Sequence, residues 1–109
     1  MFSTDRDDDA LNIHRVVIAW SENNVTWSAH GWNSGAYDSV VEASVLTGAI
    51  GWKVWDTTTL VQQWVNGTET DYGFYLINNS GGAQHVVDYH SREYVDPGLR
   101  PYLEVTYVP

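Results

Sequence analysis

A chain of 109 residues is long enough for one domain with a single core, and its net charge of −9 disfavours two classes of partner. Fourteen acidic side chains against five basic ones repel phosphate backbones and anionic lipid, so neither nucleic-acid binding nor membrane binding is expected. The sequence has no cysteine, which excludes disulfides, and its longest apolar run, residues 16–20, is too short to cross a bilayer.

The predicted elements begin with an exposed acidic lead-in over residues 1–10, followed by a single β-domain over residues 11–109. Alternating side chains predict a strand at 11–18 whose second half is apolar on both faces, so this strand is expected to be central in a sheet. The next strands are expected at 25–27, 40–46 and 50–55, with a long loop of turn-forming residues at 29–39.

One segment, residues 55–67, has a helical period instead of the strand period. Asp56 and the threonines after it can cap the start of a helix, and Gly67 follows its end as a residue that readily adopts a left-handed conformation. This short helix is expected to close one end of the β-structure. Its predicted inward-facing residues are Leu60, Val61 and Trp64.

Three further strands are expected after the helix, at 72–77, 84–90 and 102–108, the last with alternating apolar side chains. A strong turn signal, NNSGG at 78–82, separates the first two. Seven short strands with one helix and without internal repeats favour an all-β, antiparallel β-sandwich.

Four parts of the sequence resemble a known family when they are taken together. They are AWSE (19–22) with VTW (25–27), WDTT to WVNG (55–67), DYGF (71–74), and SRE (91–93) with RPYLEVTY (100–107). In this order they resemble the DNRLRE-type module, which is also seen in disaggregatase-related repeats and in a family of carbohydrate-binding modules. The resemblance implies a jelly-roll-like β-sandwich that is extracellular or surface-attached and binds polysaccharide.

The resemblance also predicts an incomplete fold. Members of this family usually carry further strands before the one that matches 11–18, and only ten residues precede it here. Missing strands leave open sheet edges, and open edges pair with other chains. We therefore expect a homo-oligomer or a subunit of a larger assembly. The alternative function is a structural, decoration or fibre component of a virion or an extracellular filament, completed by neighbouring subunits.

The carboxylates that could take part in catalysis are explained more simply by structural roles. Glu22, Glu93 and Asp96 are the acids from which a glycosidase pair could be drawn. Glu93 is expected instead to pair with Arg92 or Arg100 and so to tie down the last loop. No Gly-rich phosphate loop and no serine nucleophile motif is present. The sequence therefore predicts a protein that is not an enzyme.

Two sets of residues are candidates for binding a metal ion, the histidines and the aspartates of the lead-in. The four histidines show no metal-ligand spacing. The aspartates of the lead-in alternate as in a calcium loop but lack its glycine and its distal glutamate, so a solvated acidic tail is favoured over structural calcium. These aspartates are Asp5, Asp7, Asp8 and Asp9. No metal site and no cofactor are predicted.

Aromatic side chains in loops are the candidates for binding a polysaccharide, because a sugar ring has an apolar C–H face that stacks on an exposed aromatic ring. Trp32 and Tyr37 lead, although both could instead fold back to cap an incomplete core. Two arginines could bind a uronate carboxylate, against which the net charge of −9 argues. The predicted ligand-binding residues are Trp27, Trp32, Tyr37, Tyr94, Arg92 and Arg100.

Overall fold

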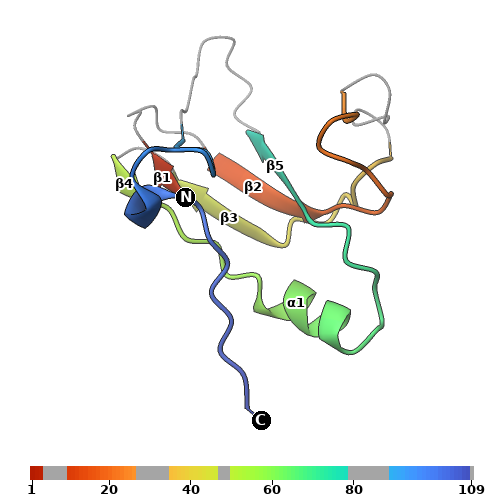
Figure 1. The fold of residues 1–109 in the computed structure, drawn as a ribbon. Helices are drawn as coiled ribbons and strands as arrows, with labels where there is room; N and C mark the ends of the chain where they lie inside the picture. Colours follow the sequence, from red (N-terminus) through yellow and green to blue (C-terminus); the bar gives the residue numbers. More distant parts are fainter. Residues whose placement is uncertain (4–9, 27–34, 47–49, 79–88, 109) are drawn as a thin grey trace.

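The computed structural model describes residues 1–3, 10–26, 35–46, 50–78 and 89–108, which form two small antiparallel sheets and one α-helix (Figure 1). In the smaller sheet, β1 (Phe2–Ser3) pairs with β4 (Gly51–Trp52). In the larger sheet, β2 (Ala10–Arg15) lies between β3 (Ala43–Leu46) and β5 (Phe74–Asn78). The helix α1 (Thr58–Val65) follows β4, and a 3-10 helix, η1, spans Pro97–Leu99.

β2 is the central strand of the three-stranded sheet, as predicted, and both of its neighbours run antiparallel to it. The strand predicted at 11–18 ends at Arg15, however, so the apolar residues 16–18 on which the prediction rested lie beyond it. Leu11 and Ile13 are buried on one face, and Asn12 and His14 on the other, because successive side chains of a strand point to opposite faces. The indole N–H of Trp55 donates a 3.0 Å hydrogen bond to the Leu11 carbonyl. This bond fastens the segment before α1 to β2.

A small hydrophobic cluster continues the core beyond the end of β2. Val16 and Ala36 are its buried members, and Tyr37 and Tyr75 pack against them with their ring centroids 4.5 Å apart. Val16 and Tyr37 also form an isolated antiparallel bridge. Burial raises the pKa of Tyr75 above its ordinary value. The chain near residue 36 is thereby held against the sheet.

α1 begins after Thr57, which makes no side-chain cap hydrogen bond, and Asp56, one residue earlier, binds Thr58 at the start of the helix. Asp56 Oδ1 accepts hydrogen bonds from the Thr58 hydroxyl (2.6 Å) and the Thr58 backbone N–H (3.0 Å). These two bonds hold the pKa of Asp56 below its ordinary value. Gly67, just after the helix, has φ = +73°, a left-handed conformation that favours glycine.

Leu60 is the fully buried residue of α1, with 0% of its surface exposed. Trp64 packs on Phe74 with the ring centroids 5.0 Å apart, but it stays partly exposed, as does Val61. The indole N–H of Trp64 is buried and has no hydrogen-bond partner among the described residues. Of the three residues predicted to face inward, Leu60 therefore has the deepest position.

Several predicted strands are wrong or shorter in the structure. Residues 102–108 form no strand and are exposed, and residues 25 and 26 form none either. The strand predicted at 50–55 shrinks to Gly51–Trp52. Alternation in a sequence shows that a segment can form a strand, but a strand also needs a neighbour in register.

The predicted lead-in is also wrong at its start, because Phe2–Ser3 pairs with β4 as strand β1. Residues 4–9 and 84–88 lie outside the described part of the chain. A strand-rich, antiparallel fold with one short helix is confirmed for the described residues. The jelly-roll sandwich and its missing strands remain predictions.

Arg15, the last residue of β2, joins three segments. Its Nη2 lies 2.6 Å from Asp38 Oδ2, its Nη1 forms an ion pair with Glu69, and its side chain is only 16% exposed. The hydrogen bond to Asp38 raises the pKa of Arg15 above its ordinary value. The Val40 backbone N–H and then Arg15 hold the pKa of Asp38 below its ordinary value.

Replacing Leu60 by Ala is expected to lower the free energy of unfolding by about 2–5 kcal/mol, the usual cost of emptying a leucine site in a core. Val65→Ala is the matched control on the same helix, because Val65 is 75% exposed. It should change stability by less than about 0.5 kcal/mol. Urea unfolding followed by circular dichroism measures both. Equal effects would contradict the packing of α1 through Leu60.

Asp38→Asn is expected to lower stability at neutral pH and to weaken its dependence on acid. The folded-state pKa of Asp38 lies below the ordinary value of 3.8, so its contribution to stability is complete above that pH. It is lost as the pH falls through the folded-state pKa. Thermal unfolding midpoints at about pH 7 and about pH 3 test this. On acidification, wild type and the exposed control Asp71→Asn should both lose more stability than Asp38→Asn. If Asp38→Asn lost as much stability on acidification as wild type does, the stabilising role of the Asp38 carboxylate would be contradicted.

Candidate functional site

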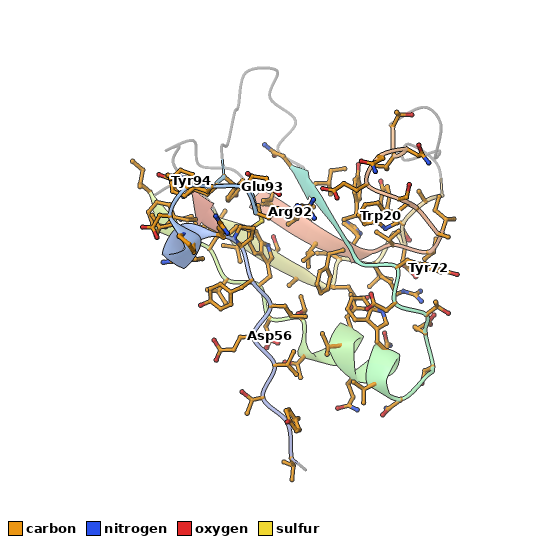
Figure 2. The ribbon with its side chains drawn as sticks, viewed as in Figure 1. Trp20, Asp56, Tyr72, Arg92, Glu93 and Tyr94 are labelled. Carbon is orange, nitrogen blue, oxygen red and sulfur yellow. The ribbon has the colours of Figure 1, made fainter. Side chains whose placement is uncertain are left out.

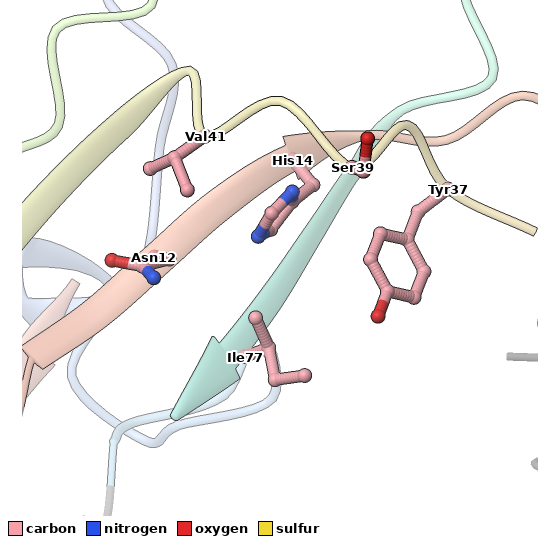
Figure 3. Close-up of a pocket in the computed structure, with 6 residues that line it drawn as sticks. All are labelled: Asn12, His14, Tyr37, Ser39, Val41 and Ile77. Carbon is pink, nitrogen blue, oxygen red and sulfur yellow. The ribbon is translucent and has the colours of Figure 1, made fainter. Parts of the chain in front are cut away.

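A half-open pocket of about 210 Å³ lies on the face of the larger sheet that carries Asn12 and His14 (Figure 3). Ile77 of β5 is the register partner of Asn12, and the chain at 37–41 forms the opposite wall. The lining residues are Asn12, His14, Tyr37, Ser39, Val41 and Ile77. Three separate segments therefore build the pocket.

The helix contacts the other face of this sheet. Phe74, on which Trp64 packs, is the register partner of Arg15. Arg15 shares its face of β2 with Leu11 and Ile13, because all three have odd positions in one strand. The pocket and the side chain of Trp64 are thus separated by the sheet.

Two polar side chains of β2 line the pocket. His14 Nδ1 lies 2.8 Å from the Asp38 carbonyl oxygen. A carbonyl can only accept, so Nδ1 carries the hydrogen and donates it, and Nε2 is the ring nitrogen left for another partner. Within the described ranges, neither Nε2 nor the Asn12 amide has a hydrogen-bond partner. Asn12 is 8% and His14 is 6% exposed, so both are held rigidly by their surroundings.

From the sequence, Tyr37 could either bind a ligand or cap the core, and in the structure it packs against the core cluster and lies beside the pocket. It packs against the Val16 cluster, with one ring face toward Tyr75, and its ring meets His14 edge-on at 5.1 Å. It also lines the pocket. Trp27 and Trp32 lie outside the described residues, so their predicted role in binding stays a prediction.

A second group of rings surrounds the smaller sheet. His90 stacks on Tyr94 at 3.5 Å and on Phe2 at 5.1 Å, and Trp52 meets Phe2 and Tyr102 edge-on at 5.8 and 5.5 Å. One ring face of Tyr94 is therefore covered by His90. Trp52 and Tyr102 are the exposed members of this group. Neither residue stands out in the sequence as a binding candidate, because its exposure depends on contacts with distant residues.

The two arginines of the last loop, Arg92 and Arg100, both bind other groups of the protein. Arg92 forms ion pairs with Glu22 (2.8 Å) and Glu93 (2.9 Å), and all three side chains are exposed (Figure 2). Arg100 Nε donates a 2.6 Å hydrogen bond to the Tyr94 carbonyl. Glu93 and Arg92 thus pair with one another, and the exposed pairs contribute little to stability. Neither arginine lines the pocket that contains Tyr37.

Two other sequence features also have structural roles. Asp96 Oδ1 accepts a hydrogen bond from the Gly98 N–H at the start of η1. The indole N–H of Trp20 donates to the Tyr72 carbonyl at 2.5 Å, and its ring lies over Gly73, which has φ = +92° (Figure 2). Trp20 is 43% exposed. In the sequence, the position of Trp20 in the AWSE segment (19–22) was the feature that could have identified it as an exposed aromatic residue.

The described residues contain neither a metal-binding cluster nor a membrane-spanning helix. There, no group of three or more acidic, histidine or cysteine side chains could hold a metal ion. The four lead-in aspartates at 5 and 7–9 lie outside this part. No helix in the described ranges is both long and apolar enough to span a bilayer.

Comparison with known protein families identifies the chain. The model for carbohydrate-binding module family 96 matches residues 2–107, nearly the whole sequence. No curated protein and no solved structure matches significantly. Carbohydrate-binding modules are generally non-catalytic and are usually extracellular or surface-attached. The carbohydrate-binding part of the predicted resemblance is confirmed, while its DNRLRE-type part remains a prediction. The chain belongs to carbohydrate-binding module family 96.

Proposed function

We propose that the chain binds a polysaccharide and that the pocket between β2, β5 and residues 37–41 holds one sugar residue of it. Family membership supports carbohydrate as the ligand. The observation that carries the choice of site is that the Asn12 amide and His14 Nε2 line a half-open pocket and have no partner among the described residues, whereas His14 Nδ1 is bound to the Asp38 carbonyl. Preformed hollows with a few converging polar groups are the usual form of ligand sites.

The chemistry of the lining suits a sugar ring. The Asn12 amide both donates and accepts hydrogen bonds, His14 Nε2 accepts, and the Ser39 hydroxyl does either. Val41 and Ile77 supply apolar contacts for the C–H groups of the ring. The volume of about 210 Å³ is below that of sites for larger ligands, so one residue of the polymer fits. The open side lets the rest of the polymer continue outside.

Hydroxyl groups, and not carboxylates, are the groups that this pocket recognises. Apart from His14, its lining contains no acidic or basic side chain, and it contains no arginine or lysine that could bind a carboxylate. Arg15 and Arg92 are each paired with two carboxylates elsewhere. Binding should accordingly depend weakly on salt, because salt screens charge pairs and leaves neutral hydrogen bonds largely unaffected.

Asn12→Ala and Ser39→Ala are each expected to weaken binding by about 2- to 10-fold, the usual net value of one hydrogen bond. Affinity electrophoresis in gels that contain neutral or uronate polysaccharides identifies the ligand and measures the change. Asn66→Ala is the matched control, because Asn66 lies at the end of α1. It should bind as wild type does.

Two further measurements make this test decisive. Thermal unfolding shows whether Asn12→Ala still folds, and Ser39, which is exposed, gives a variant that leaves the core intact. Trp52→Ala reports on the rings around the smaller sheet. Loss of binding in Trp52→Ala, together with unchanged binding in both pocket variants, would overturn the pocket as the site.

A further inference from the structure

Residues 102–108 have the pattern of a strand but no partner strand among the described residues. Leu103, Val105 and Tyr107 alternate with Glu104 and Thr106, and all of them are exposed. Figure 1 shows the segment leading away from both sheets to the C-terminus. A row of alternating apolar side chains in water is unfavourable, as is an open row of backbone groups that invites pairing.

The larger sheet has an edge that suits such a segment. β3 pairs with β2 and has no second neighbour among the described strands. Val45 lies opposite Leu11, so the sheet face beside this edge is apolar. On the other face Ser44 and Leu46 are exposed. An added strand can thus place its apolar side chains beside Val45 and its polar side chains beside Ser44.

We propose that residues 102–108 add as an antiparallel strand to the β3 edge of a second copy of this chain, and that the exchange is reciprocal. One chain carries both the donor segment and the acceptor edge, so two copies related by a two-fold axis satisfy both at once. Leu103, Val105 and Tyr107 then lie against the apolar face beside Val45. This pairing is independent of the sugar pocket, because no pocket residue lies in 102–108.

A second copy fits the observations better than an intramolecular pairing does. The segment leads away from its own sheets, and Tyr102 at its start is tied to Trp52 by a ring contact of 5.5 Å. Each copy has a charge of −9, which opposes association at low ionic strength. Added salt should therefore favour the dimer, whereas a pairing based on ion pairs would weaken.

Light scattering coupled to size-exclusion chromatography tests the proposal on the full chain. Wild type should have twice the chain mass of 12.3 kDa, and its dimer fraction should rise with salt. Val105→Pro, which removes a backbone donor from the strand, should give the single-chain mass. Val105→Thr keeps the N–H and the β-branch and should remain dimeric. Val65→Ser, which removes an equally exposed valine from α1, should also remain dimeric.

Two readouts identify the contact itself. Hydrogen exchange should show protected amides at 102–108 in wild type and unprotected ones in Val105→Pro, with near-UV circular dichroism confirming that the variant is folded. The chain has no cysteine, so mixtures of Ser44→Cys with Glu104→Cys or Thr106→Cys report contacts between copies. A disulfide-linked dimer from either mixture is expected.

Three results would overturn the proposal. The first is a wild type that stays monomeric at high protein and salt concentration. The second is protection of 102–108 in a monomer, which would show pairing within one chain. The third is a dimer that neither cysteine mixture links, which would exclude β3 as the acceptor edge.

Discussion

The guanidinium of Arg15, held between Asp38 and Glu69 at the end of β2, organises the described part of the molecule. A charge that is only 16% exposed must be matched by partners, because its desolvation is costly. Asp38 supplies one carboxylate, and its backbone carbonyl also binds His14. The same residue thus compensates the charge and fixes the segment at 37–41 over the sheet. Backbone hydrogen bonds from Asp38 to Arg15 and from Glu42 to Ile13 hold the same segment beside β2.

The proposed recognition of a sugar depends on the sheet face more than on the aromatic residues. The rings around the smaller sheet stack largely on one another, and Tyr94 has one face covered by His90. Arg92 is bound by Glu22 and Glu93. By contrast, Asn12 and His14 are buried in the sheet face and line the pocket, and the Asn12 amide and His14 Nε2 have no hydrogen-bond partner among the described residues. Rigid polar groups bind a ligand at a lower entropic cost than mobile side chains do.

Each described sheet has only two or three strands, so most of its strands are edge strands. The backbone groups of an edge strand can pair with another chain, and the small sheets therefore favour the proposed assembly. The family match covers residues 2–107, so it includes the exposed segment at 102–108. Pairing of that segment with β3 of a second copy would leave the pocket open, because the pocket is lined from β2, β5 and residues 37–41. A dimer would then present two sugar sites to one polymer, which raises avidity.

The sequence by itself determined the local features of this protein. The helical period predicted α1, the alternating side chains predicted a strand where β2 lies, and the combined segments pointed to a carbohydrate-binding family. These signals depend on neighbours within a few residues, which a sequence displays directly. The pairing of Glu93 with Arg92 is local in the same way.

Only the tertiary structure decided which residues meet across the chain. Nothing in the local pattern shows that Asn12 and Ile77 lie in register, that Asp38 reaches Arg15, or that the strand-like segment at 102–108 lacks a partner among the described strands. Tyr37 shows the same limit, since its loop position fitted a ligand site and a core position equally well, and only the structure shows that it packs on the core cluster and lines a pocket. Register and burial arise from long-range packing, so side chains of one type have different roles at different places in the fold.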